Sequence, residues 1–198
     1  MSSSSARRTA GIPGALTEET FSVSRDPASE RRLSKVVERY FSVVWRALRR
    51  FGVPESAADD AAQQVLLTFA ARMASVEVAR ERAFLASTAV RVAANVRRKS
   101  ERAREVPIDE VESGLAGEAT PDALLEEKQR RLVLDEALGA LPFEQRTVFV
   151  LFELEGFTLP EIAESLEIPL GTATSRLRRA RHRFEAWVAS HDSKGDEP

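Results

Sequence analysis

Five arginines, whose side chains could bind an anion, fall within residues 176–183. No acid interrupts residues 170–184, so this positive charge is not neutralised locally. Arginine keeps its charge and donates several hydrogen bonds, which suits phosphate groups. The chain has no cysteine and only two histidines, His182 and His191, so we expect no disulfide, metal site or other cofactor. The pattern indicates binding to a polyanion.

A short capped helix and a turn precede these arginines and would position them. Thr158 and Glu161 have the spacing of a capping box, in which each side chain satisfies the backbone N–H of the other residue. A second helix is predicted from about residue 170, and its apolar residues, spaced 4, 3 and 4, give it one buried face. This pattern favours a DNA-binding helix-turn-helix over an ordinary solvated face. The residues predicted to bind DNA are Thr172, Thr174, Ser175, Arg176, Arg178, Arg179 and Arg183.

The rest of the chain carries helical apolar periodicity without convincing strand alternation, which predicts an all-α protein. The first module would hold three or four helices, with starts at Leu33, after Ser56 and near Arg80. The second would open near Pro121 and end in the helix-turn-helix. We expect two small helical domains, and the segments in chain order are a disordered leader (1–30), the first module (31–104), a flexible acidic linker (105–121), the second module (122–190) and a tail (191–198).

Charge is divided unevenly among these segments. Residues 31–104 hold 16 lysines and arginines against 7 acids, whereas residues 105–128 hold 8 acids against one lysine. This suggests two modules that meet a polyanion, joined by a connector that does not. No apolar run approaches the ~20 residues that a bilayer span requires, and the N-terminus lacks the apolar core of a signal peptide. We therefore expect a cytoplasmic protein without membrane insertion.

Several motifs resemble those of a known family. The order and spacing of "LP", "QR", "EIAE.L" and "GT..SRL.RAR" within residues 138–184 resemble the promoter −35-reading region of bacterial sigma-70 factors, and the two-domain extracytoplasmic function branch is the most similar. Residues 58–69 are similar to that family's core-polymerase-binding helix, and residues 83–102 to its helix that melts and reads the −10 element. The turn glycine of the family is Glu167 here, which would cost up to ~1 kcal/mol if the turn needs a positive φ.

The resemblance implies a dissociable subunit, not an enzyme, that contacts the clamp and flap of core RNA polymerase and gives it promoter specificity. The helix-turn-helix residues would then bind the −35 element of promoter DNA. An anti-sigma factor is a further partner of this class, and the sequence leaves it open. The residues that would bind the single-stranded −10 element are Arg91, Asn95, Arg97, Arg98, Lys99 and Arg102. Those that would bind core polymerase are Asp59, Asp60, Gln63, Gln64, Val65 and Leu67.

Two other functions fit part of the sequence. A helix-turn-helix regulator would use residues 31–104 as a sensor or dimerisation domain, and a helical adaptor would use its arginines to bind an acidic protein. The basic charge of the first module favours the sigma factor, because a ligand-sensing domain is more often neutral or acidic. A salt-dependent shift of double-stranded promoter DNA only when polymerase is present favours the sigma factor. Binding as a dimer to a palindrome without polymerase favours the regulator, and no DNA binding in either condition favours the adaptor.

Overall fold

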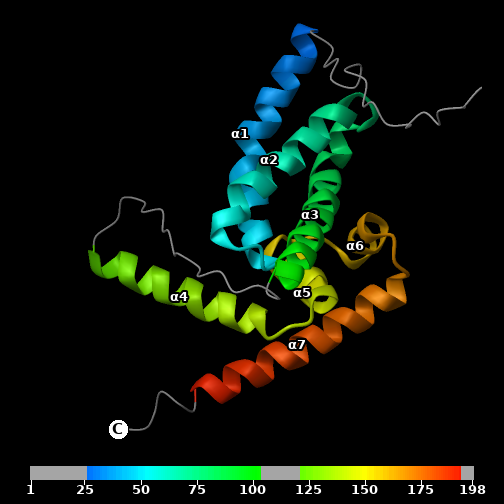
Figure 1. Ribbon diagram of the computed structural model, residues 1–198. Helices are drawn as coiled ribbons and strands as arrows, with labels where there is room; N and C mark the ends of the chain where they lie inside the picture. Colours follow the sequence, from blue (N-terminus) through cyan, green and yellow to red (C-terminus); the bar gives the residue numbers. More distant parts are fainter. Residues whose placement is uncertain (1–25, 104–120, 193–198) are drawn as a thin grey trace, which may run out of the picture.

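The computed structural model describes residues 26–103 and 121–192, with side chains placed over 26–100 and 130–191, and within these ranges it is helical without strands. Short 3₁₀ turns, Met73–Ser75 and Val78–Arg80, join the second and third helices, and a π-helical turn, Val150–Leu154, follows the fifth. Figure 1 shows the arrangement of the α-helices, which are α1 (Pro27–Arg50), α2 (Glu55–Arg72), α3 (Glu81–Ala103), α4 (Pro121–Gly139), α5 (Phe143–Phe149), α6 (Leu159–Leu166) and α7 (Leu170–Asp192).

Helix α1 begins earlier than the sequence analysis predicted. The Asp26 carboxylate caps it by accepting from the Ala28 N–H, and Pro27 occupies the first turn, where a missing N–H costs nothing. The prediction of a disordered leader is therefore wrong for residues 27–30. The rest of the leader, the linker over 104–120 and the tail from 193 lie outside the described residues.

Helices α1, α2 and α3 pack together as the N-terminal half. Helix α2 contributes the small buried residues Ala58, Ala61 and Ala62, which allow the neighbouring helices to approach closely. Phe69 on α2 meets Phe84 on α3 edge to face, with ring centroids 6.0 Å apart. The predicted three-helix arrangement of residues 31–104 is thus present.

Helices α4 to α7 form the C-terminal half, in which α5 and α6 pack against the long helix α7. Gly156 ends the π-helical turn with a φ of +65°, a conformation that glycine adopts at little cost and that allows the chain to reverse into α6. Helix α4 contacts α7 but projects away from the other helices in Figure 1. The all-α fold class predicted from periodicity is confirmed.

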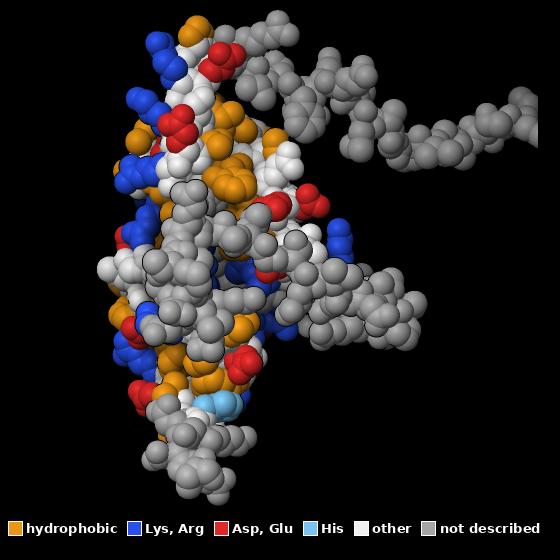
Figure 2. Space-filling view, turned by 90° about the vertical axis from the view of Figure 1, so that its left-hand side faces the viewer, with side chains coloured by type: hydrophobic (Ala, Val, Ile, Leu, Met, Phe, Trp, Pro, Cys, Tyr) orange, Lys and Arg blue, Asp and Glu red, His pale blue; other side chains and the backbone are white. Residues whose placement is uncertain are grey.

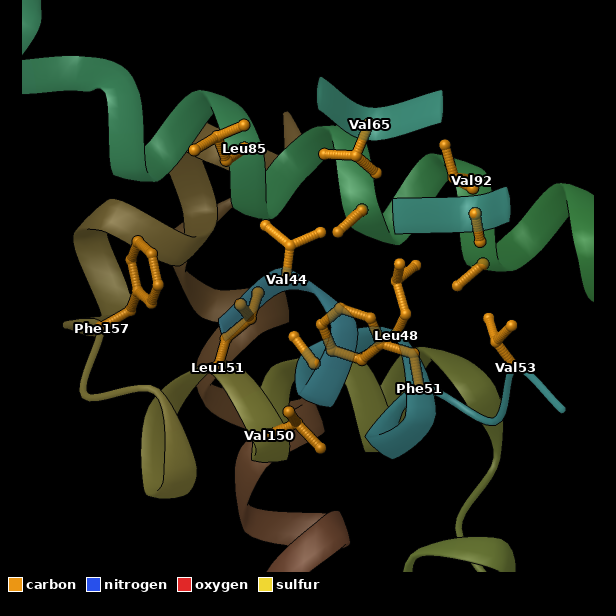
Figure 3. Packing of buried hydrophobic residues seen from close by; sticks show 14 of the residues in the cluster. Val44, Leu48, Phe51, Val53, Val65, Leu85, Val92, Val150, Leu151 and Phe157 are labelled. Carbon is orange, nitrogen blue, oxygen red and sulfur yellow. The ribbon is translucent and has the colours of Figure 1, made fainter. Parts of the chain in front are cut away.

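The two halves share one hydrophobic core. Leu48 and Phe51 at the end of α1 lie beside Val150 and Leu151 of the C-terminal half, and all four are almost completely buried (Figure 3). The sequence predicts two modules on a tether, and no feature of it indicates that they pack together. Each half therefore relies on the other to exclude water from part of its apolar surface.

Neither a membrane-spanning helix nor a metal-binding group is found among the described residues. No helix among them combines the length and the apolar character that a bilayer span needs. No group of three or more His, Asp or Glu side chains within the same ranges is placed to hold a metal ion.

Candidate nucleic-acid interface

Helix α6 begins in a complete capping box. The Thr158 hydroxyl accepts a hydrogen bond from the Glu161 N–H at 3.4 Å, and the Thr158 N–H donates to the Glu161 carboxylate at 2.7 Å. The bond from the Thr158 backbone is the main reason why the pKa of Glu161 lies below its ordinary value of 4.5. Phe157 and Ile162, at the staple positions around the cap, are both buried. The predicted cap is confirmed, and it fixes where α6 begins.

The turn between α6 and α7 places a glutamate in the left-handed region. Glu167 has φ 55° and ψ 42°, and the Ile168 N–H donates to the Ala163 carbonyl at 3.0 Å to close the end of α6. A side chain in this conformation costs about 1 kcal/mol or more relative to glycine. The turn does need a positive φ, so the expected cost of Glu167 is present.

The inner face of α7 is packed as its spacing predicts. Ala173, Leu177 and Ala180 are buried, and the Phe184 ring stacks on that of Phe149 with centroids 4.9 Å apart. Since this face is committed to the core, the rotation of α7 is fixed and its opposite face must meet solvent or a partner.

The arginines of α7 divide into two groups. Arg181 turns toward the body of the protein, where it pairs with Glu153 at 2.6 Å and lies over the Phe152 ring. Within the described part of the chain, Arg176, Arg178 and Arg183 form no ion pair. Arg178 and Arg183 are exposed and Arg176 is half-buried. A guanidinium that is not neutralised remains available to a phosphate.

The polar side chains near the start of α7 are tied to its own backbone. The Thr174 hydroxyl donates to the Leu170 carbonyl at 2.9 Å and that of Ser175 to the Thr172 carbonyl at 3.0 Å. Arg179 donates to the Ser175 carbonyl and hydroxyl, both at 3.2 Å. The Thr174 hydroxyl keeps its two acceptor lone pairs and that of Ser175 keeps one, so the face can both donate and accept, as base edges require. All seven predicted helix-turn-helix residues lie on α7. They include Arg176, Arg178 and Arg183, the arginines without an ion pair.

The basic residues of α3 are partly engaged by the C-terminal half. Arg91 pairs with Glu167 of the turn at 2.9 Å, and Arg97 lies over the Phe143 ring at 4.8 Å. Arg98 contacts Asn95 one turn earlier on the same helix, and Lys99 is exposed. The side chain of Arg102 lies outside those described. The structure therefore brings two of the predicted −10 residues against the C-terminal half and leaves the others on the helix surface.

The residues predicted to bind polymerase lie on two faces of α2. Asp59, Asp60, Gln63, Gln64 and Leu67 are exposed, and Leu67 keeps 53% of its surface open to solvent. Val65 has no exposed surface, because it points into the core between the helices, and its place among the partner-facing residues is a correction to the prediction. The prediction also missed Trp45, whose indole N–H donates to the Asp59 carboxylate at 2.9 Å and orients it. In the sequence, the one indication of this contact is that a tryptophan has an N–H that needs an acceptor when the ring is packed.

Comparison with known proteins identifies the C-terminal half. Residues 125–184 match the family described as "Sigma-70, region 4", and this range contains the capping box, the turn and the first two-thirds of α7. The ECF RNA polymerase sigma factor SigE of Mycolicibacterium smegmatis is 30% identical over 99 residues, which cover 50% of this chain and 38% of that protein. The ECF RNA polymerase sigma-E factor of Haemophilus influenzae is 39% identical over 67 residues, covering 33% of this chain and 35% of that protein.

Residues 125–184 therefore resemble region 4 of the sigma-70 family, and both of these relatives are sigma factors of its ECF branch. The chain spans about two-fifths or less of the length of these curated relatives. Two solved sigma factors share the fold: CnrH in complex with the cytosolic domain of CnrY (TM-score 0.61, 22% identity, 85% of this chain and 92% of that one) and RpoE with the anti-sigma factor NepR from Bartonella quintana (TM-score 0.62, 20% identity, 80% and 98%).

In this sigma-70 fold, polar contacts as well as the shared core join the two halves. Arg50 of α1 pairs with Glu155 at 2.8 Å, and both side chains are largely shielded from solvent. Arg82 of α3 donates to the Glu155 carbonyl and lies over the Phe157 ring at 4.1 Å. Arg80 pairs with Glu164 on the surface at 2.9 Å. The arginines of these contacts come from α1, the 3₁₀ turn Val78–Arg80 and the start of α3, and the acceptors come from the C-terminal half.

Arg146 of the family's Gln-Arg pair lies at the junction of the two halves. Its guanidinium donates to the Gly139 carbonyl at 2.8 Å, and its Nε is buried without a partner. Burial is the main cause that lowers the pKa of Arg146, and the nearby charge of Arg97 adds to the effect. Gly52, with φ +93°, lies so close that a Cβ there would clash with the guanidinium. The positive φ favours glycine, and a Cβ would in addition force the guanidinium to shift.

Proposed function

We propose that the chain is an ECF-type sigma factor that binds core RNA polymerase and directs it to promoters. The observation that carries the proposal is the set of α7 arginines without ion pairs, presented by a capped helix-turn-helix inside the region 4 match. Arg178 and Arg183 of this set are exposed, and Arg176 is half-buried. Helix-turn-helix proteins place this second helix in the major groove, where its early residues meet base edges and its arginines meet phosphates. The role needs no catalytic residue.

The division of labour follows the two halves. Helix α7 would read the −35 element, and the basic surface of α3 would follow the phosphates of the separated −10 strand. The exposed acids and amides of α2, with Leu67 beside them, would contact the polymerase clamp, since polar groups fix the register of an interface around a small apolar contact.

The contact between the halves suggests a resting state. Arg91 is taken up by Glu167, and the −10 and −35 surfaces belong to halves that share one core. Because the two promoter elements are separate stretches of DNA, engaging both would require the halves to part. Both solved neighbours are complexes with a second protein, in one case named an anti-sigma factor, and this supports a regulator of that class that binds this chain with its halves together.

Transcription in vitro tests the proposal directly. Bacterial core polymerase is incubated with the chain and a library of genomic fragments, and the RNA start sites are mapped. We expect the chain to concentrate initiation at a small set of sites with a common upstream sequence. Initiation that is unchanged by the chain, or a chain that does not associate with core polymerase, would overturn the assignment.

Two substitutions separate the roles of the halves. Arg176→Gln should abolish initiation that depends on the −35 element and leave polymerase binding intact. Asp60→Ala should weaken polymerase capture. Arg72→Gln, an exposed cation at the end of α2, is the matched control and should leave both activities unchanged. A chain that binds a palindromic duplex as a dimer without polymerase would instead be a helix-turn-helix regulator.

A further inference from the structure

A row of cations runs along the solvent face of α1, and none of the surfaces assigned above uses it. Arg31, Lys35 and Arg39 follow one another at intervals of four residues, and Arg46 lies two turns further along. At 100° per residue the four side chains lie within about 80° of one another, on the side of α1 opposite its buried residues. All four are exposed, and Figure 2 shows Lys and Arg side chains in succession down the upper left edge, at the height of α1 in Figure 1.

The cations of this α1 row form no ion pair with any carboxylate of the described residues. Arg31 donates to the Pro27 carbonyl, and Arg39 lies over the Tyr40 ring. The other arginines of α1 each have an acid partner, the closest being Arg32–Glu81 at 2.8 Å and Arg50–Glu155 at 2.8 Å. Arg49 continues the line of the row at the end of α1, where it is half-buried and pairs with Asp135 at 4.0 Å. The helix therefore leaves open the exposed cations from Arg31 to Arg46 and neutralises its half-buried ones.

We propose that the α1 row binds the phosphate backbone of duplex DNA. From Arg31 to Arg46 the row extends about 22 Å along one straight helix, the rise of roughly six to seven base pairs. The Ser42 hydroxyl lies within the row and can donate to a phosphate, and Glu38 is the one acid on this face of α1.

A protein partner fits this surface less well. Between the cations the face carries no apolar residue, whereas the centre of a protein interface is apolar and depleted in charge. A linear array of guanidinium groups instead matches a linear polyanion. The contact is independent of sequence and does not involve α3 or α7, so it is distinct from promoter reading.

The size of the effect follows from counterion release. Each phosphate neutralised contributes about 0.9 to the slope of log Kobs against log salt, so four contacts give about 3.6, or roughly 150-fold between 50 and 200 mM salt. Arg31→Gln/Lys35→Gln/Arg39→Gln should lower the slope of the whole chain by about 2.7, equally for any duplex. Glu38→Gln should act in the opposite direction and tighten binding at low salt.

The measurement is fluorescence anisotropy of a labelled 30-base-pair duplex without promoter sequence, titrated with the full-length chain at several KCl concentrations. The matched control is Arg72→Gln/Arg130→Gln/Arg131→Gln, which removes the same charge from exposed positions on other helices. The proposal requires the α1 variant to lose slope relative to this control. Equal slopes for the two triple variants would overturn it, as would weaker or unchanged binding by Glu38→Gln.

A crosslink identifies the partner. Photoreactive benzoylphenylalanine in place of Lys35 is irradiated in a mixture of the chain, core polymerase and the same duplex. A crosslink to DNA supports the proposal, whereas a crosslink to a polymerase subunit alone, or none, overturns it. The anisotropy measurement uses no polymerase and a duplex without promoter sequence, so it reports a sequence-independent contact that is separate from polymerase-dependent promoter binding. Its result therefore stands whether or not the chain redirects transcription.

Discussion

Replacing Glu167 with glycine tests the account of the α6–α7 turn. The left-handed conformation of Glu167 costs about 1–2 kcal/mol that glycine would not pay. Glycine also loses more conformational freedom on folding, about 0.5–1 kcal/mol. The ion pair with Arg91 would be lost, but its side chains are 57% and 78% exposed, so solvent screening reduces its contribution to a few tenths of a kcal/mol. The terms leave a net stabilisation of about 0.5 kcal/mol.

The control is Glu167→Gln, which keeps the strained conformation and removes only the charge. For a chain of this size 1 kcal/mol shifts Tm by about 2–4 °C, so Glu167→Gly should melt about 1–2 °C above the parent and Glu167→Gln slightly below it. Thermal unfolding followed by circular dichroism measures both. If the glycine variant melts no higher than the glutamine variant, the strain assigned to this turn is absent and the reasoning is refuted.

Three other predictions concern stability and are measured in the same way. Thr158→Ala removes the hydroxyl from the cap of α6 and should cost about 1 kcal/mol at neutral pH. The hydroxyl donates to the Glu161 carboxylate and adds to the backbone bond in lowering its folded pKa, so the hydroxyl's share is present above pH 4.5 and lost as pH falls through the folded pKa. A gap between variant and parent that does not narrow in acid would contradict this prediction. Leu151→Ala should cost about 2–5 kcal/mol and lower a single melting transition, whereas two separate transitions would contradict a shared core. Gly52→Ala should destabilise the fold by more than about 1 kcal/mol, because both the φ of +93° and the Arg146 guanidinium oppose a Cβ. An unchanged Tm would contradict this, because it would show that the backbone and the Arg146 side chain move aside at little cost.

Features that depend on near neighbours in the chain could be predicted from the sequence. The capping box needs only Thr158 and Glu161 three residues apart, and the buried face of α7 needs only its apolar spacing. The start of α1 was also within reach, since an aspartate followed by a proline is a helix-start signal, and the serine-rich composition of the leader outweighed it.

Features that join distant segments could not be predicted in this way. Arg50 and Glu155 are 105 residues apart, and nothing in the composition of either segment indicates that they meet. The placement of Val65 failed for a related reason: a residue next to exposed Gln64 on a helix can face the core, and only the packing of all three helices decides it. The pairing of Trp45 with Asp59 likewise depends on how α1 crosses α2.

The apolar contact at Phe51 and Leu151 has a consequence for binding measurements. Any ligand that requires the halves apart competes with this contact, so its measured affinity equals its intrinsic affinity multiplied by the fraction of molecules already open. A substitution that weakens the contact without touching the ligand's own surface would thus make the chain a stronger binder while making it a less stable protein. Affinity and melting temperature would then change in opposite directions across a series of variants at this one position.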